Sequence, residues 1–501
     1  MIARIISATT VGFNGQIIEV ECDASKGLPT LQIVGLGNKA IDEAKERVRS
    51  AIKNSHLDFP ARKVTINLAP ANIPKDGAHF DLPIALAITS VNGQLRPEDT
   101  AEKVFAGELS LDGSLRSIRG AIHLAETAKQ AGYKEIFLPK NNASTAAMIT
   151  GITVYGVSSL AELFLHLKKE KLIQPEQYHA HSLSSSHDKD IVTIDDIHGQ
   201  EQAKRALIIA CAGHHNVLFT GPPGTGKTML ARAIVDLLPP LSPNEQIEVL
   251  KMHSLVDEEL ETPALSRPFR NPHHTSSYIS LVGGGTRPLP GEMSLAHHGV
   301  LFLDELPEYP RSSIEAMRQP LEDRTISISR AHAKVTYPAN FMLIATQNPC
   351  PCGYLGDPTK ECVCSQQQIL QYQKKLSGPL LDRIDLIVPV GKINHKDMLK
   401  KTHKSSTIVA IKKSIQQARQ QQHQRYSDDT MTNSQLNSKH IKQYFVISPE
   451  VQNILDLAAH KLALSTRSYF KLLKVARSIA DLDAAPEISP AHITEALQYR
   501  A

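Results

Sequence analysis

The alternation of hydrophobic and polar residues predicts that residues 1–170 mix strands and helices. Apolar and polar residues alternate over 16–22 and again over 64–68, and both patterns predict strands. Apolar positions recur at helical spacing over 40–49, which predicts an amphipathic helix. The apolar run 82–88, with a proline in its first turn, predicts a buried helix. The first block is therefore expected to be an α+β domain.

Residues 191–393 carry a different pattern, in which short apolar runs are separated by helical segments. The runs 217–219, 300–303 and 341–345 have the continuous apolar character of strands buried on both faces of a parallel sheet. Apolar positions at helical spacing over 201–212 precede the first run. This block is expected to be an α/β domain.

The last block, 394–501, is predicted to be helical. Its periodic segments predict helices over 411–422, 451–462 and 468–482, and a closing helix from Pro490, capped by Ser489. The polar stretch 426–438 has no period and predicts a flexible loop. A second polar stretch, 171–190, is rich in serine and histidine and predicts an interdomain linker.

Composition sets bounds on function. The chain has 501 residues, of which 41% are apolar and 21% charged, as in ordinary globular proteins. No apolar run reaches the roughly 18 residues of a membrane span, and the N-terminus turns polar too soon for a signal peptide, so we expect a cytoplasmic protein with no membrane partner. The net charge of +4 is too small to imply nucleic-acid binding without a local basic surface.

The clearest chemical motif follows the apolar run 217–219. It matches the phosphate-binding loop G-x-x-x-x-G-K-[ST] between a strand and a helix and comprises Gly221, Pro222, Pro223, Gly224, Thr225, Gly226, Lys227 and Thr228. Glycines let backbone N–H groups approach phosphate oxygens, and the helix N-terminus favours an anion. We expect Lys227 to reach the β- and γ-phosphates of ATP and Thr228 to bind Mg²⁺.

Polar residues end the other two apolar runs. Asp304 and Glu305 follow 300–303, and such paired acids predict a cation site, with Asp304 holding Mg²⁺ and Glu305 polarising the attacking water. Asn348 ends the next run and is expected beside the γ-phosphate. Arg383, placed after a helix, is a candidate arginine finger supplied to a neighbouring subunit, with a surface salt bridge as the alternative.

These pieces, in this order, resemble the AAA+ ATPases. Longer phrases at 269–276, 281–285, 290–297 and 303–308 look like the magnesium-chelatase-like YifB/ComM family, and the resemblance covers nearly the whole chain. It implies a homo-hexameric ATPase that moves on single-stranded or branched DNA. It also implies that Arg467 is a second sensor touching the γ-phosphate from a helical lid, with Arg477 as the alternative.

The first block resembles the protease domain of Lon in two segments, 74–81 and 107–120. Lon uses a serine activated by a lysine. At the aligned positions this chain carries His79 and Ile122, so the resemblance implies the Lon fold without its proteolysis. His79 is expected to be a structural histidine, with a catalytic role as the alternative.

Two local features bear on partners and metals. Residues 324–335 alternate as a hairpin does, and the predicted tip carries the candidate DNA-contacting residues Arg330, His332 and Lys334, or alternatively a solvated basic turn. Four of the six cysteines form two C-x-C pairs that could close one structural Zn²⁺ site, or remain reduced thiols: Cys350, Cys352, Cys362 and Cys364.

The resulting expectation is an α/β protein with a Lon-protease-like domain (1–170), a linker (171–190), an AAA+ core with insertions (191–393) and a helical lid (394–501). Its expected activity is ATP hydrolysis coupled to translocation on DNA, as in a branch-migration helicase of recombination or natural transformation. The alternatives are a chelatase-type ATPase that remodels a protein partner, an ATP-dependent protease and a non-enzymatic scaffold.

Overall fold

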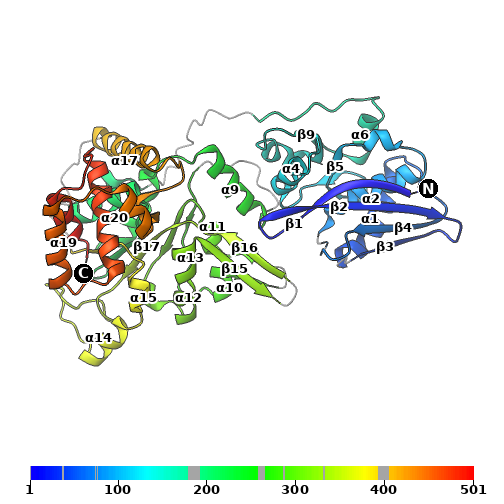
Figure 1. Ribbon diagram of the computed structural model, residues 1–501. Helices are drawn as coiled ribbons and strands as arrows, with labels where there is room; N and C mark the ends of the chain where they lie inside the picture. The colour runs from blue at the N-terminus through cyan, green and yellow to red at the C-terminus, as the bar shows by residue number, and fades with distance from the viewer. Residues whose placement is uncertain are drawn as a thin grey trace.

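The computed structural model describes residues 2–35, 39–73, 75, 77–178, 192–257, 266–285, 288–330, 333–392 and 405–500. The molecule is elongated, with an N-terminal unit at one end and the C-terminal helices at the other (Figure 1). Several expectations lie outside the described residues: most of the linker, the boundary at 393–394, His332, and the side chain of Arg330.

The N-terminal unit is built on a seven-stranded mixed sheet in the order β3-β4-β2-β1-β5-β8-β9. Its first two strands form a long antiparallel hairpin that spans the unit. The strands are β1 (Ile2–Val11), β2 (Asn14–Ser25), β3 (Thr30–Val34), β4 (Lys63–Ala69), β5 (Lys103–Phe105), β8 (Glu135–Pro139) and β9 (Thr153–Val157). The two strands predicted at 16–22 and 64–68 are confirmed as parts of β2 and β4.

Helices cover both faces of this sheet. Ile5 of β1 packs in a core with α1 (Lys39–Asn54) and α2 (Asp81–Val91). Ala8 lies three residues further along the strand, so it faces the other side, where it packs with α4 (Ala121–Gln130) and α5 (Lys140–Ala146). The predicted helices at 40–49 and 82–88 are therefore confirmed. A further helix, α6 (Leu160–Leu167), follows β9.

The central unit contains a five-stranded sheet in the order β11-β14-β17-β10-β18, and every pair is parallel. Its strands are β10 (Val217–Thr220), β11 (Phe269–Arg270), β14 (Val300–Leu303), β17 (Met342–Gln347) and β18 (Leu386–Pro389). The three apolar runs of the sequence thus lie side by side. Their carboxyl ends share one edge, which is where open α/β sheets bind ligands.

Insertions extend this unit toward the N-terminal one (Figure 1). The segments between β10 and β14 include α8 (Lys227–Leu237), α9 (Pro243–Ser254), α10 (Tyr278–Val282) and α11 (Glu292–Leu295). After β14 come α12 (Arg311–Ala316), α13 (Arg318–Asp323) and the hairpin of β15 (Thr325–Arg330) and β16 (Ala333–Pro338). The predicted hairpin is confirmed, in a register that pairs Thr325 with Pro338 and Arg330 with Ala333.

The C-terminal block is helical, as predicted. It comprises α17 (Ser405–Tyr426), α18 (Ser438–Tyr444), α19 (Pro449–Lys461), α20 (Thr466–Leu482) and α21 (Pro490–Leu497). Apolar residues of α20 share one hydrophobic core with β10 and with α7 (Glu201–Gly213), so these helices pack directly on the parallel-sheet unit.

The prediction of a flexible loop at 426–438 is wrong. Asn433 is fully buried, and its side-chain amide donates to Ser478 Oγ and Asp481 Oδ2, both at 2.9 Å. Its backbone N–H donates to Gln422 Oε1 at 3.0 Å. Buried polar groups are paired in this way, and a polar composition did not distinguish a buried network from a solvated loop.

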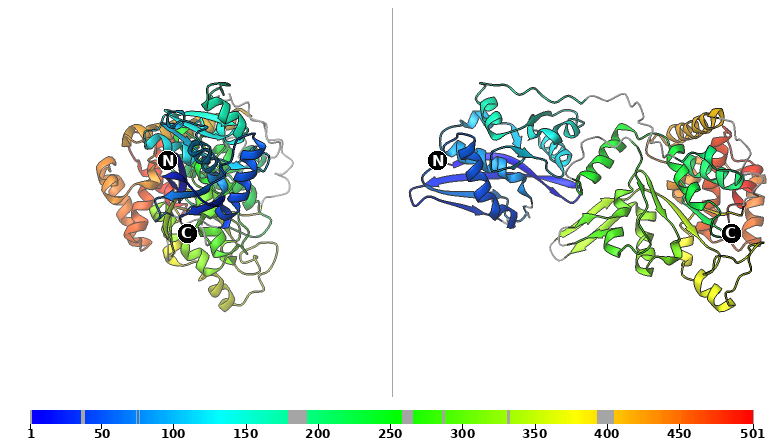
Figure 2. Two further views of the ribbon diagram at one scale, coloured as in Figure 1. Left: turned by 90° about the vertical axis from the view of Figure 1, so that its right-hand side faces the viewer. Right: turned by 180° about the vertical axis from the view of Figure 1, so that it is seen from behind.

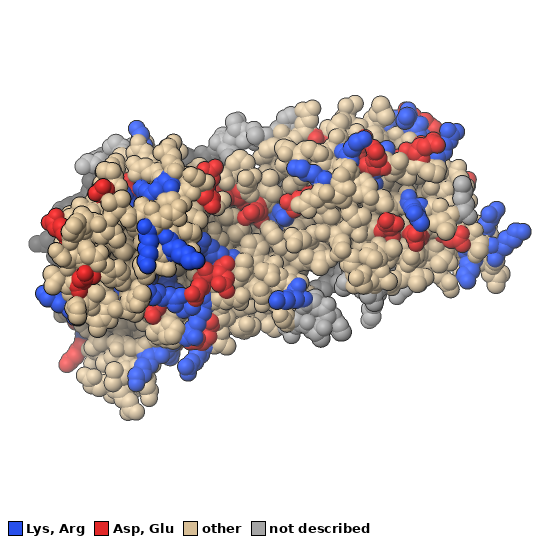
Figure 3. Space-filling view, in the orientation of Figure 1, with Lys and Arg blue, Asp and Glu red and all other residues tan. Residues whose placement is uncertain are grey.

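None of the described helices combines the length and the apolarity that a bilayer span requires. On the face drawn in Figure 3, basic and acidic side chains are interspersed, and basic ones gather mainly over the C-terminal helices. No broad basic field covers that face, so a nucleic-acid contact there would have to be local.

Candidate nucleotide site

The phosphate-binding loop joins the end of β10 to the start of α8. Gly224 and Gly226 have φ values of 76° and 86°, which side chains rarely adopt. At position 221 a glycine is required because the backbone of Val390 lies against it. A Cβ there would lie 2.1 Å from the carbonyl oxygen of Val390. The loop therefore presents backbone amides at the N-terminus of α8, the arrangement that binds phosphate.

Lys227 is buried among oxygen acceptors. Its Nζ donates to the carbonyl oxygens of Gly221 at 2.6 Å and Pro222 at 2.8 Å, and to Asn348 Oδ1 at 3.1 Å. Burial lowers the pKa of Lys227, and the nearby carboxylates of Asp304 and Glu305 partly offset that effect. The amine thus lies in a desolvated position where a polyphosphate could replace the loop carbonyls as its partner.

Two oxygen ligands suited to Mg²⁺ face one another beside this amine. Thr228 Oγ1 lies 3.2 Å from Asp304 Oδ2. The other oxygen of Asp304 accepts a hydrogen bond of 2.5 Å from Thr346 Oγ1, which fixes the carboxylate. Mg²⁺ prefers one or two such hard oxygens together with water and phosphate, so the residues present fit this ion.

Glu305 is positioned by its own backbone. It has a left-handed φ of 53°, and its N–H donates to Thr346 Oγ1 at 2.9 Å. Left-handed backbone at a non-glycine residue is uncommon and gathers at functional sites. Asn348 Nδ2 lies 3.4 Å from Glu305 Oε1, while Asn348 Oδ1 accepts from Lys227. The Asn348 amide therefore bridges Lys227, the candidate phosphate-binding amine, and Glu305, the candidate water-polarising carboxylate.

The four clustered cysteines lie beside this site. The sulfur of Cys350 is 3.4 Å from that of Cys352 and 3.6 Å from that of Cys362, and the latter two sulfurs are 3.6 Å apart. With Cys364, all four sulfurs lie within 4.8 Å of one another. Sulfurs bound tetrahedrally at about 2.3 Å from Zn²⁺ stand about 3.8 Å apart, so this cluster fits that ion.

The cysteine loop also touches the phosphate-binding loop. A Cβ on Gly353 would lie 2.8 Å from Pro223 Cδ, so the two backbones are close. Backbone N–H groups, first that of Tyr354, lower the pKa of the Cys352 thiol to about 6. At Cys362 and Cys364 a backbone N–H lowers the pKa, but burial and the neighbouring thiols outweigh it and raise the pKa, so only the shift of Cys352 favours the thiolate that a metal binds. Cys350 follows Asn348 by two residues, so the cluster is anchored next to that side chain.

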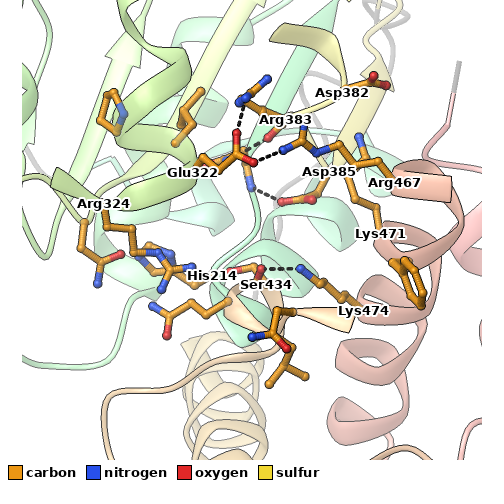
Figure 4. A pocket seen from close by; sticks show the side chains of 18 of the residues that line it. His214, Glu322, Arg324, Asp382, Arg383, Asp385, Ser434, Arg467, Lys471 and Lys474 are labelled. Atoms are coloured by element: carbon orange, nitrogen blue, oxygen red, sulfur yellow. Dashed lines mark hydrogen bonds and ion pairs between the residues drawn. The ribbon is translucent and has the colours of Figure 1, made fainter. Parts of the chain in front are cut away.

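Arg383 and Arg467 meet at a site away from their own phosphate-binding loop. Both guanidinium groups pair with Glu322, Arg383 through Oε2 and Arg467 through Oε1 at 2.5 Å. They line a cavity of about 330 Å³ whose other residues include the charged side chains of Arg324, Asp382, Asp385, Lys471 and Lys474 (Figure 4). His214 also lines it, and burial holds the pKa of that ring well below its usual value. The structure therefore brings the finger candidate and the second-sensor candidate together, but not beside Lys227.

Arg477, the alternative sensor candidate, is buried and bonded to residues at the end of its own helix. It is 3% exposed, pairs with Asp481 at 3.0 Å and donates to the carbonyl oxygens of Ala485 and Pro486. These partners lie at the end of α20, where a cation stabilises the helix terminus.

The candidate DNA-contacting residues lie at the closed end of the β15–β16 hairpin. Lys334 is exposed and pairs across the hairpin with Ser329. Arg330 pairs through its backbone with Ala333, and His332 falls outside the described residues. Of the three candidates, only Lys334 has a described side chain.

The two Lon-aligned positions do not form a nucleophile and base. His79 Nε2 donates to the carbonyl oxygen of Ala8 at 3.2 Å, and burial lowers its pKa to about 4, so the ring is neutral. Ile122 is buried in the core beneath α4.

Two functional candidates were absent from the sequence predictions. Thr346 contacts the carboxylate of Asp304 and the backbone N–H of Glu305. It had a signal, because it lies two residues before Asn348 at the carboxyl end of the same apolar run. Glu322 holds two arginines from distant segments, and no pattern in the sequence marks it.

Comparison with known proteins gives matches along nearly the whole chain. The family model described as "Magnesium chelatase, subunit ChlI" matches residues 193–398. "Subunit ChlI of Mg-chelatase" matches 20–142, and "Magnesium chelatase, subunit ChlI C-terminal" matches 404–500.

Several individual proteins are similar. The competence protein ComM of Haemophilus influenzae is 41% identical over 503 residues, covering 100% of this chain and 97% of that protein. YifB of Escherichia coli K12 is 43% identical over 494 residues, covering 98% and 95%. The magnesium-chelatase 67 kDa subunit of Heliobacterium mobile is 30% identical over 193 residues, covering 32% of this chain and 28% of that protein.

Proposed function

This chain belongs to the YifB/ComM family of magnesium-chelatase-like proteins, and from that premise we propose that it is a ring-forming ATPase that drives movement along branched or single-stranded DNA. The observation that carries the ATPase part is the linked set of Lys227, Asn348 and Glu305 at the carboxyl edge of a parallel sheet.

The geometry suggests a role for each group. Lys227 and the loop amides bind the phosphates, and Thr228 with Asp304 would hold Mg²⁺, which neutralises charge on the β- and γ-phosphates when bound. Glu305 orients the attacking water and accepts its proton. Asn348 is hydrogen-bonded to both Lys227 and Glu305. A shift of Lys227 toward phosphate would therefore alter the hydrogen bond that holds Glu305.

The arginines support a site shared between subunits. Arg383 and Arg467 lie together at Glu322 rather than at Lys227. Arginines that stabilise the transferring phosphoryl group can come from a neighbouring chain. We propose that both serve the ATP of the adjacent subunit in a closed ring.

DNA is the proposed track for two reasons. A full-length relative is named a competence protein, and the β15–β16 hairpin ends in basic residues, of which Lys334 is exposed. Lysine contacts to phosphates give binding that is independent of sequence and sensitive to salt.

We also propose that the four cysteines hold one structural Zn²⁺. The support is the mutual spacing of the sulfurs and the chemistry of a four-thiolate donor set, which zinc prefers in closed structural sites.

A strand-displacement and branch-migration assay on forked and four-way junction DNA tests the function. We expect the wild type to convert junctions with ATP, and Glu305→Gln to bind ATP and DNA without converting them. ATP turnover that no DNA alters, at any salt concentration, would overturn the DNA proposal while leaving the ATPase proposal intact.

The second candidate is a chelatase-type ATPase that remodels a protein partner, and the partial match to a magnesium-chelatase subunit favours it. That match covers a third of the chain, whereas ComM and YifB match nearly all of it. The junction assay separates the two, because a protein remodeller has no reason to convert DNA.

A further inference from the structure

The N-terminal unit touches the motor at the turn between β1 and β2 (Figures 1 and 2). Phe13, in that turn, packs against the hydrophobic core beneath the β15–β16 hairpin. The backbone of Gly12 lies directly on this hairpin, since a Cβ there would come within 2.3 Å of Val335 Cγ1. The turn of the first hairpin therefore rests on a strand of the second.

Helix α9 also contacts Phe13, through Lys251. Lys251 Nζ lies 4.3 Å from the centre of the Phe13 ring and 2.6 Å from Glu126 Oε2, and the lysine is 6% exposed. A buried ammonium is tolerated only when it is paired. Here its partners, an aromatic face and a carboxylate, both come from the N-terminal unit.

Backbone contacts extend this junction. The N–H of Gly120 donates to the carbonyl oxygen of Ser254 at 2.9 Å, and Ser254 Oγ lies 3.4 Å from His123 Nδ1. His123 packs edge-on against Phe13 with ring centres 5.6 Å apart. We call Phe13, Lys251 and Val335, with the groups that touch them, the Phe13 joint.

The N-terminal half of α9 contacts the catalytic strand. Glu248 Oε2 accepts from His297 Nε2 at 2.9 Å and from His298 Nε2 at 2.7 Å, and Glu245 Oε1 lies 3.3 Å from His298 Nδ1. The two histidines lie three and two residues before β14, and Asp304 and Glu305 follow the end of that strand.

This cluster is a clamp rather than a metal site. The N–H of Asn340 donates to His297 Nδ1 at 3.0 Å, so the proton of that ring resides on Nε2. A protonated nitrogen cannot bind a metal, and this one donates to Glu248 instead. The clamp therefore fixes α9 to the start of β14.

We propose that the N-terminal domain acts as a lever arm of the motor, coupled through the Phe13 joint. In this proposal α9 receives movement at the His297–His298 clamp and passes it to the N-terminal domain and to the β15–β16 hairpin together. The domain's role is then mechanical, which accounts for a Lon-like unit without a nucleophile and base. The inference rests on the proposed ATPase motor, but no residue of the joint belongs to the nucleotide site.

Phe13→Ala in the full-length chain tests this proposal, with Leu28→Ala as the matched control. Leu28 lies in the same domain and is 83% exposed. We expect Phe13→Ala to keep ATP turnover without DNA and to keep DNA binding, while junctions converted per ATP hydrolysed fall by about 2- to 30-fold, the range seen for coupled elements. The control should match the wild type, and unchanged conversion per ATP in Phe13→Ala would overturn the proposal.

A second measurement remains informative if the wild type converts no DNA. Hydrogen exchange is followed with and without ATP in Glu305→Gln, which should bind ATP without hydrolysing it. The lever predicts that ATP changes exchange in α9 and also in the β1–β2 turn, and that adding Phe13→Ala confines the change to α9. A change confined to α9 with Phe13 intact would refute the lever, whatever the track of the motor.

Discussion

At the scale of single residues, the candidate site depends on side chains that hold the catalytic groups as much as on those groups themselves. Thr346 is fully buried; its hydroxyl donates to Asp304 and accepts the N–H of Glu305. A single hydroxyl thus fixes one carboxylate and the backbone of the next residue. Preorganised groups of this kind avoid rearrangement during the reaction.

Thr346→Val should keep the fold and lower ATP turnover. The side chains have nearly the same shape, so the main loss is the two hydrogen bonds, and partners of this kind typically contribute about 10- to 100-fold in activity. Steady-state ATPase kinetics would show a fall in kcat with a smaller effect on ATP binding. Thr336→Val, on an exposed strand position, is the control and should leave turnover unchanged; full turnover in Thr346→Val would contradict the role.

At the scale of elements, the cysteine loop and the β15–β16 hairpin are short segments with separate tasks. The cysteine loop follows β17 and rests on the phosphate-binding loop near Pro223. The hairpin extends from α13, whose residue Glu322 holds both arginines. The cysteine loop thus lies at the phosphate-binding loop, whereas the hairpin is attached to the helix that holds the two arginines.

Loss of zinc from the cysteine cluster should weaken the candidate nucleotide site, because the cluster begins two residues after Asn348. Cys362→Ser removes one of the four proposed zinc ligands, and we expect bound zinc to fall from one equivalent per chain to well below it, with reduced ATP turnover. Elemental analysis and turnover measure the two effects. Val363→Ser changes the exposed residue beside it and should keep the metal. If the purified wild-type protein contained no zinc, the proposal that the four cysteines bind zinc would be contradicted.

Lys334→Gln should weaken DNA binding without loss of basal ATP turnover. Each lost phosphate contact lowers the slope of log K against log salt by about 0.7 on single strands and 0.9 on duplex DNA. Fluorescence anisotropy over a salt series measures that slope. Lys461→Gln, exposed at the end of α19, should leave it unchanged; an equal effect of both substitutions would argue for general charge rather than the hairpin.

At the scale of the whole molecule, the candidate ATPase residues lie at two separate places. Lys227 and Glu305 lie at one site, whereas Arg383 and Arg467 lie at Glu322 in a separate cavity (Figure 4). A ring of head-to-tail contacts would bring the second site of one chain to the first site of the next.

Mixing inactive variants tests this sharing. Lys227→Ala and Arg383→Ala should each be nearly inactive, but an equal mixture should regain about a quarter of wild-type turnover, because in a random ring that fraction of sites joins an intact lysine to an intact neighbouring arginine. An equal mixture of Lys227→Ala and Arg467→Ala should regain the same fraction of turnover if Arg467 also acts on the ATP of the neighbouring subunit. No recovery in that second mixture would return Arg467 to the site of its own chain.

Much of the fold and the central chemistry could be predicted from the chain. The parallel strands, the phosphate-binding loop, Asp304 and Glu305 follow from local patterns, because strand burial and phosphate binding require particular residue types at neighbouring positions. The hairpin at 324–335 and the clustering of the four cysteine sulfurs also follow from short sequence spacings. The buried segment around Asn433 was missed, because its partners Ser478 and Asp481 lie far along the chain.

The sequence by itself thus determined which residues are the candidates for binding and hydrolysing a nucleotide, since that chemistry is encoded within short segments. Only the tertiary structure decided that Arg467 lies with Arg383 at Glu322, and that Phe13 connects the N-terminal unit to α9 and the hairpin. The physical reason is that these contacts join residues more than sixty positions apart. Their geometry depends on how whole elements pack, and no local period or motif reports it.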